Sequence, residues 1–204
     1  MLPETAYPVV GRLAPLILAS ASPRRRELLS AAGIVFEVIV CELREPSARP
    51  AHVSARAWAL ALAYFKARAV AERRPGRWVL AADTVVDCDG ELMGKAADAR
   101  DARRMLLKQA GRRSEVITGV CLVREEGAAP RRSFTLASTG VWMRRDPARI
   151  DAYVASEQWR GKAGAYGIQD VGDHLVERID GSFSNVVGLP VERVLALLER
   201  IAGR

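Results

Sequence analysis

The sequence has few cysteines and few histidines, which excludes several kinds of site. The cysteines are Cys41, Cys88 and Cys121, which are widely spaced and form no CxxC motif. A disulfide framework or a zinc site is therefore not expected, and a reducing cytoplasm is the expected compartment. The two histidines, His52 and His174, have no sequence partner that suggests a metal site or a catalytic triad.

Long apolar runs are also missing. No window approaches the ~20 continuous apolar residues of a membrane-spanning helix. The first residues, MLPETAYPVVGRLAP, lack the basic start and apolar core of a signal peptide. We therefore expect a cytoplasmic protein with no membrane partner.

Charge and composition favour a folded domain with anionic partners. Of the 204 residues, 50% are hydrophobic and 27% are charged, and the net charge is +7. The arginines are scattered with few aromatic residues beside them, which indicates compositional bias more than a nucleic-acid surface. We expect one domain over residues 1–204, with residues 1–12 as a loose N-terminal leader.

The hydrophobic periodicity predicts alternating helices and strands. Helices are expected over residues 23–32, 54–73, 98–109, 146–155 and 190–202. Strands are expected over residues 13–19, 34–40, 77–87, 114–125, 132–145 and near 174–179, with an Asp89-Gly90 hairpin turn after the third. In the helix over 54–73, the spacing of Trp58, Leu62, Phe65 and Ala69 predicts the buried face. This pattern is typical of an α/β or α+β domain built around a mixed sheet.

Three arginines stand in the first turn of the helix over residues 23–32. Ser22 fits the N-cap and Pro23 the first helical position. Arg24, Arg25 and Arg26 then lie at the positive end of the helix dipole, where each cation costs about 0.3–1 kcal/mol. An anion docked at this turn explains the arrangement; the alternative is an exposed, basic helix start.

Two further segments have residue types that suggest a ligand site. Asp83 follows the small and apolar residues 78–82, at a place where strand ends often face ligands; an N-cap or turn aspartate is the alternative. The segment KAGAYGIQ, from Lys162 to Gln169, lets backbone approach a ligand closely and supplies polar side chains; an ordinary tight connection is the alternative. Lys95 follows Gly94 but lacks the upstream glycine of a phosphate-binding loop.

Six ordered motifs make the chain resemble the Maf family of nucleoside triphosphate pyrophosphatases. They are SASPRRRELL, AADTVV, GELMGK, VITGVCLV, KAGAYGIQ and GSFSNVVGLP, and they extend over nearly the whole chain. The resemblance implies an α/β fold like that of inosine triphosphatase, with a long mixed sheet flanked by helices and an active-site cleft between two lobes. It implies hydrolysis between the α and β phosphates, giving a monophosphate and pyrophosphate, with Mg²⁺ or Mn²⁺ as cofactor.

The resemblance also assigns roles to individual residues. Asp83 matches the proton acceptor and a metal ligand, and Ser22, Arg24 and Arg25 match a phosphate-binding turn. Lys95 and Lys162 match lysines that would neutralise phosphate charge, and Lys66 matches another family lysine at the edge of its helix's apolar face. Glu45 matches a metal ligand, although Arg44 stands where the family usually has another acidic residue; Glu42 is the alternative ligand. A carboxylate with an ordinary pKa of about 3.9 suffices as a base when a metal makes the water more acidic.

Base choice in the family is tied to positions held here by Arg24, Thr84 and Gln169. This combination resembles the branch acting on dTTP and UTP, and such side chains can complement the edge of uracil or thymine. Modified pyrimidine triphosphates stay open as substrates. The alternatives are a pyrophosphatase for 7-methyl-GTP or another modified nucleotide, and a basic protein that binds nucleic acid or regulates septum formation. We expect no specific nucleic-acid partner, and a homodimer as the assembly.

Overall fold

The computed structural model describes residues 15–42, 46, 49–127, 129–169 and 175–203. The expected leader over residues 1–12, together with Arg44, Glu45 and His174, lies outside this part of the chain. Within it, no helix is long and apolar enough to cross a membrane.

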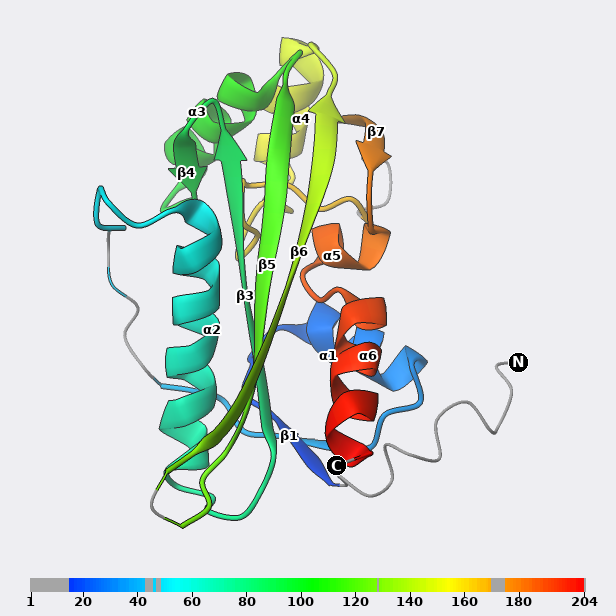
Figure 1. Cartoon of the computed structure of the whole chain (residues 1–204). Coiled ribbons are helices and arrows are strands. Elements are labelled where there is room, and N and C mark those ends of the chain that lie inside the picture. Colours follow the sequence, from blue (N-terminus) through cyan, green and yellow to red (C-terminus); the bar gives the residue numbers. More distant parts are fainter. Residues whose placement is uncertain (1–14, 43–45, 47–48, 128, 170–174, 204) are drawn as a thin grey trace.

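A mixed sheet runs through the molecule (Figure 1). Within the described residues its seven strands are β1 (Leu16–Leu18), β2 (Phe36–Val38), β3 (Val79–Cys88), β4 (Glu91–Met93), β5 (Arg113–Arg124), β6 (Arg131–Met143) and β7 (Val176–Asp180). Their order is β2-β1-β3-β5-β6-β7, with β4 paired to the end of β3. The β1 pairings with β2 and β3 are parallel, and the remaining ones are antiparallel. The predicted α/β class with a long mixed sheet is confirmed.

Helices cover both faces of this sheet. They are α1 (Pro23–Ala31), α2 (Ala55–Ala71), α3 (Ala99–Gln109), α4 (Pro147–Ala155), α5 (Phe183–Val187) and α6 (Val191–Ala202). Figure 1 shows α2 on one face, α1, α5 and α6 on the other, and α3 and α4 beside the far ends of the long strands. The short helix α5, which Ser182 caps, was not expected from the sequence.

The predicted cap of the first helix is confirmed, because the side chain of Ser22 accepts a hydrogen bond at the start of α1. Asp98 and Asp146 cap α3 and α4 in the same way. Asp89 and Gly90 have φ angles of 53° and 80° in the hairpin between β3 and β4, as a tight hairpin turn requires. The strand expected over 34–40 is shorter than predicted, since only Phe36–Val38 pair as β2.

The predicted buried face of α2 is wrong in part. Leu62 is buried, but Phe65 is 48% exposed. The small residues Ala59, Ala63 and Ala67 face the sheet instead. The reason lies in β5, where a Cβ on Gly119 would come within 2.6 Å of the Ala59 backbone. The helix therefore lies too close to the sheet for large side chains at the contact.

Candidate active site

A cavity of about 530 Å³ opens where α1, β3, α5 and the loop over residues 160–169 meet. Every described residue of the predicted site lines it: Ser22, Arg24, Arg25, Lys66, Asp83, Thr84, Lys95, Lys162 and Gln169. Segments that are far apart in the sequence thus form one cavity. Their individual roles stay predictions, and Glu45 lies outside the described residues.

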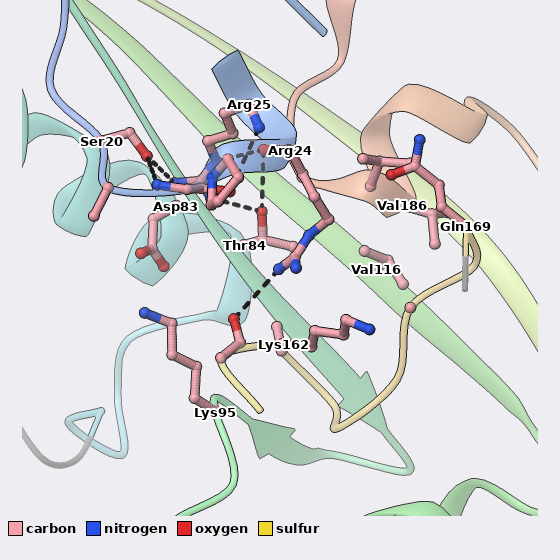
Figure 2. A pocket seen from close by; sticks show the side chains of 18 of the residues that line it. Ser20, Arg24, Arg25, Asp83, Thr84, Lys95, Val116, Lys162, Gln169 and Val186 are labelled. Atoms are coloured by element: carbon pink, nitrogen blue, oxygen red, sulfur yellow. Dashed lines mark hydrogen bonds between the residues drawn. The ribbon is translucent and has the colours of Figure 1, made fainter. Parts of the chain in front are cut away.

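The three arginines of the first turn of α1 point in different directions. Ser22 Oγ accepts a hydrogen bond from the backbone N–H of Arg25 and so starts the helix. The side chain of Arg24 reaches across the cavity (Figure 2), and its Nη2 donates to the carbonyl oxygen of Gly161 at 3.3 Å. Arg26 is exposed and does not line the cavity. Of the three side chains, that of Arg24 is the one placed across the cavity.

Arg25 is held by the protein itself. Its Nε donates to the carbonyl oxygen of Gly188 at 2.8 Å, and its Nη1 to that of Ala82 at 2.7 Å. Its Nη1 and Nη2 also donate to Ser20 Oγ at 3.4 Å and Thr84 Oγ1 at 3.1 Å. These bonds tie α1 to β3 and to the turn after α5. They give Arg25 a structural part in the site, while a direct phosphate contact stays a prediction.

Asp83 carries the carboxylate on the α2 side of the cavity. Its Oδ1 accepts a hydrogen bond from Lys66 Nζ of α2, and the two side chains are 9% and 14% exposed. The expectation that Asp83 lies at a strand end, or is an N-cap or turn aspartate, is wrong, because Asp83 lies inside β3 and pairs with Gly119 in the β3–β5 register. Because Gly119 has no side chain, α2 comes close enough to this part of the sheet for Lys66 to reach the carboxylate. The pairing of Lys66 with Asp83 was not predicted from the sequence.

Two lysines reach the cavity from different segments, Lys95 from the residues after β4 and Lys162 from the glycine-rich loop over residues 160–169. Lys95 is exposed and forms a backbone bridge to Ala163. Lys162 is buried, with its Nζ 3.5 Å from the Tyr153 hydroxyl of α4. Gly164 has a φ of +69°, and a Cβ there would come within 2.8 Å of Val86 Cγ2. A glycine is therefore needed for the loop to pack against β3 at this place.

Charge in the cavity is strongly asymmetric. Among the described lining residues, Asp83 is the one carboxylate, whereas the cations are Arg24, Arg25, Lys66, Lys95, Arg160 and Lys162. A concave surface lined by one sign of charge concentrates ligands of the opposite sign. The cavity therefore suits a polyanion.

The cavity has two chemically different ends. Figure 2 shows Asp83 and Lys95 on one side, with Gln169, Val116 and Val186 on the other and Arg24 between them. The first side suits phosphate groups. The second combines apolar side chains with an exposed amide, which suits a flat ring with polar edges.

The described residues contain no cluster of three or more His, Cys, Asp or Glu side chains that could hold a metal. Asp83 nevertheless fits Mg²⁺ or Mn²⁺ in one way. Magnesium is commonly held by one or two carboxylates together with substrate phosphates and water. The described residues thus fit a metal that is held jointly by Asp83 and a bound phosphate chain.

Sequence reasoning missed a group of buried polar residues behind the cavity. Thr118 and Asn185 are both 0% exposed, and Thr118 Oγ1 lies 3.0 Å from Thr84 Oγ1. Tyr153, behind Lys162, was also missed. A signal existed for Thr118, because it is a polar residue within the apolar run VITGVCLV.

Sequence comparisons find a matching family model and similar proteins. A family model described as Maf-like protein matches residues 15–201. A protein of Geobacter sulfurreducens named dTTP/UTP pyrophosphatase is 45% identical over 189 residues, which cover 91% of this chain and 96% of the relative. Proteins of the same name from Geobacter metallireducens and Anaeromyxobacter dehalogenans are 48% and 46% identical. The matched segments cover 88% and 91% of this chain and 92% and 93% of the two relatives.

Proposed function

The chain belongs to the Maf-like protein family, and from this premise we propose that it is a nucleoside triphosphate pyrophosphatase acting on dTTP and UTP. The observation that carries the proposal is the convergence of Asp83, Lys66, Lys95 and Lys162 in one cavity. The names of the relatives supply the substrate. Modified pyrimidine triphosphates share the same chemistry and are further candidates.

The triphosphate fits the charged end of the cavity. Lys95 and Lys162 both line the cavity and would neutralise the phosphates. Arg24, which reaches across the cavity, would contact the nucleotide between its two ends. The base would lie beside Gln169, Val116 and Val186.

Asp83 is the proposed proton acceptor. Water would attack the α-phosphorus while the bond to the oxygen bridging the α and β phosphates breaks, so that pyrophosphate leaves. Asp83 would orient this water and take its proton. Lys66 keeps the carboxylate in place through the ion pair between α2 and β3. Lys95 and Lys162 would stabilise the negative charge that develops on the leaving pyrophosphate.

A divalent cation held by Asp83 and the phosphates would supply Lewis-acid polarisation and make the attacking water more acidic. Glu45 stays a predicted second ligand. Removing divalent metal with a chelator is expected to stop turnover, and adding Mg²⁺ or Mn²⁺ to restore it.

The experiment is pyrophosphate release from dTTP, UTP, CTP, GTP, 5-methyl-UTP and 7-methyl-GTP, with Mg²⁺ or Mn²⁺. Wild type, Asp83→Asn and the exposed-site control Arg26→Ala are compared. Release from dTTP and UTP that is lost in Asp83→Asn and kept in Arg26→Ala would support the proposal. Release from 7-methyl-GTP alone would show that 7-methyl-GTP, and not dTTP or UTP, is the substrate. Unchanged turnover in Asp83→Asn would show that Asp83 is not the base.

Compartment and assembly also stay proposals. All three cysteines are free thiols, which supports a reducing cytoplasm. The proposed homodimer is checked by sedimentation or light scattering of the purified chain.

A further inference from the structure

The hydroxyl of Thr84 lies in the wall of the cavity and has three protein partners. Arg25 Nη2 donates to it at 3.1 Å, while Thr118 Oγ1 and the Gly188 carbonyl oxygen lie at 3.0 and 3.5 Å. A hydroxyl has one proton and two lone pairs. The direction of that proton therefore decides what Thr84 can offer to a bound ligand.

The neighbouring Thr118 fixes this direction. Thr118 lies opposite Thr84 in the β3–β5 register and has no exposed surface. Its Oγ1 donates to the Asn185 carbonyl oxygen at 3.2 Å. A hydroxyl that donates its one proton to Asn185 can only accept from Thr84, although either hydroxyl could be the donor in the contact between them. The competing contact from Thr84 to Gly188 is longer, so the favoured direction runs from Thr84 through Thr118 to Asn185.

The end of this relay is held firmly. Asn185 is 0% exposed, and its Nδ2 donates to the Val116 carbonyl oxygen and to Thr139 Oγ1, both at 3.0 Å. Its backbone N–H donates to Ser182 Oγ at 3.1 Å at the start of α5. The carbonyl oxygen that receives the proton of Thr118 is therefore fixed by α5 and by two strands of the sheet.

We propose that Thr118 is a specificity-determining residue that acts through Thr84. By accepting a hydrogen bond from the Thr84 hydroxyl, it leaves Thr84 with a lone pair, and no free O–H donor, for the nucleotide base. Thr118 contacts no substrate itself and is a positioning residue. This inference rests on the proposed function, because it concerns which base the same cavity accepts.

The consequence follows from the base edges. Uracil and thymine have an N–H donor at N3, whereas cytosine has an acceptor there. A lone pair on Thr84 complements the first and opposes the second. A site whose buried polar groups are left unpaired by an analogue discriminates strongly against it. The relay thus predicts a preference for UTP over CTP whose size corresponds to one hydrogen bond.

Thr118→Val tests the relay, because it removes the nearer acceptor for the Thr84 hydroxyl with little change in shape. The Gly188 carbonyl oxygen at 3.5 Å and a bound base then compete for the Thr84 proton. Thr118→Ser keeps the hydroxyl. Ser114→Ala removes a buried hydroxyl from the same strand, one that faces Val141 and takes no part in the relay. For each variant, kcat and KM are measured with UTP and CTP. Binding of the hydrolysis-resistant α,β-methylene analogues of both is measured by calorimetry, and thermal melting reports folding.

The ratio of kcat/KM for UTP over CTP is expected to fall about tenfold in Thr118→Val, the usual effect of one mispaired buried hydrogen bond. It should stay at the wild-type value in Thr118→Ser and Ser114→Ala. An unchanged ratio, or an equal loss on both nucleotides, would overturn the inference. If Thr118→Val does not fold, Thr118→Ala removes the same acceptor and is judged by the same ratio.

The two proposals fail in different ways. A wild-type protein that releases no pyrophosphate from dTTP or UTP overturns the proposed function. The calorimetric ratio for the two analogues then decides the inference by itself: a drop in Thr118→Val supports it, and an unchanged ratio overturns it.

Discussion

Lys66 and Asp83 join helix α2 to strand β3 through an ion pair at the wall of the cavity, with both side chains largely buried. The pair connects the packing of the sheet to the proposed reaction, because the helix that covers the sheet also holds the carboxylate of the proposed base, Asp83.

The ion pair is expected to behave as a coupled unit. Lys66→Met leaves a buried carboxylate without this partner, and such losses cost about 3 kcal/mol of the free energy of unfolding. In Lys66→Met/Asp83→Asn the charge is gone as well, so the double variant should be more stable than the sum of the single variants predicts. Urea unfolding of all four proteins measures the coupling. Additive effects would show that the two side chains do not interact in solution.

The three arginines of α1 are expected to give three different phenotypes. Arg25→Ala should lower both the melting temperature and the activity, because it breaks bonds to Gly188, Ala82 and Thr84. Arg24→Ala should leave the melting temperature near that of wild type and raise KM about tenfold, as expected when one charged hydrogen bond to a ligand is lost. Arg26→Ala should change neither. Melting curves and steady-state kinetics check this, and equal phenotypes for Arg24 and Arg26 would contradict the orientation described for Arg24.

Gly119→Ala is expected to damage the site from a distance. The new methyl group would overlap the backbone between Ala59 and Leu60, so α2 must move away from the sheet and carry Lys66 with it. Overpacking of this kind costs about 1–3 kcal/mol. The same change at Gly203, which meets no atom closer than 3.4 Å, is the matched control. Urea unfolding and kcat check the prediction, and a Gly119→Ala protein with wild-type kcat would show that α2 does not position Asp83.

The three thiols are expected to differ in reactivity. Burial raises the pKa of Cys121 to about 12 and also raises that of Cys88. A raised pKa keeps a thiol protonated and unreactive until the pH approaches that value, so Cys121 should resist alkylation from pH 7 to pH 10 in the folded protein. Cys41 is partly exposed and lines the cavity. Iodoacetamide labelling followed by mass spectrometry should find Cys41 modified first, and dTTP or pyrophosphate should slow this modification. Labelling of Cys121 at the same rate would contradict the burial.

Much of this structure was predictable from local signals. The Ser22 cap and the Asp89-Gly90 turn act within a few residues, so the sequence alone places them. The face of α2 was predicted less well because large residues usually mark a buried face. Here the sheet approaches closely at Gly119, which favours alanine at the contact and leaves Phe65 outside. That approach is a property of two elements together and has no local signature.

The same limit applies to the site. The motifs identified the residues that line the cavity, but they did not show which of them bind one another. Lys66 with Asp83, Arg25 with Gly188, and Thr118 with Asn185 are pairs brought together by the sheet and the helices across it. Such partners become visible only when the register of β3 and β5 and the place of α5 are known.

The cavity is assembled from segments near residues 20, 66, 83, 95, 162 and 187, so it spans most of the chain. Its formation therefore requires contacts of high sequence separation, which form late in folding and cost loop-closure entropy. No short fragment holds all of these segments together. Loss of turnover in denaturant should consequently coincide with global unfolding, and during refolding activity should return only in the final phase.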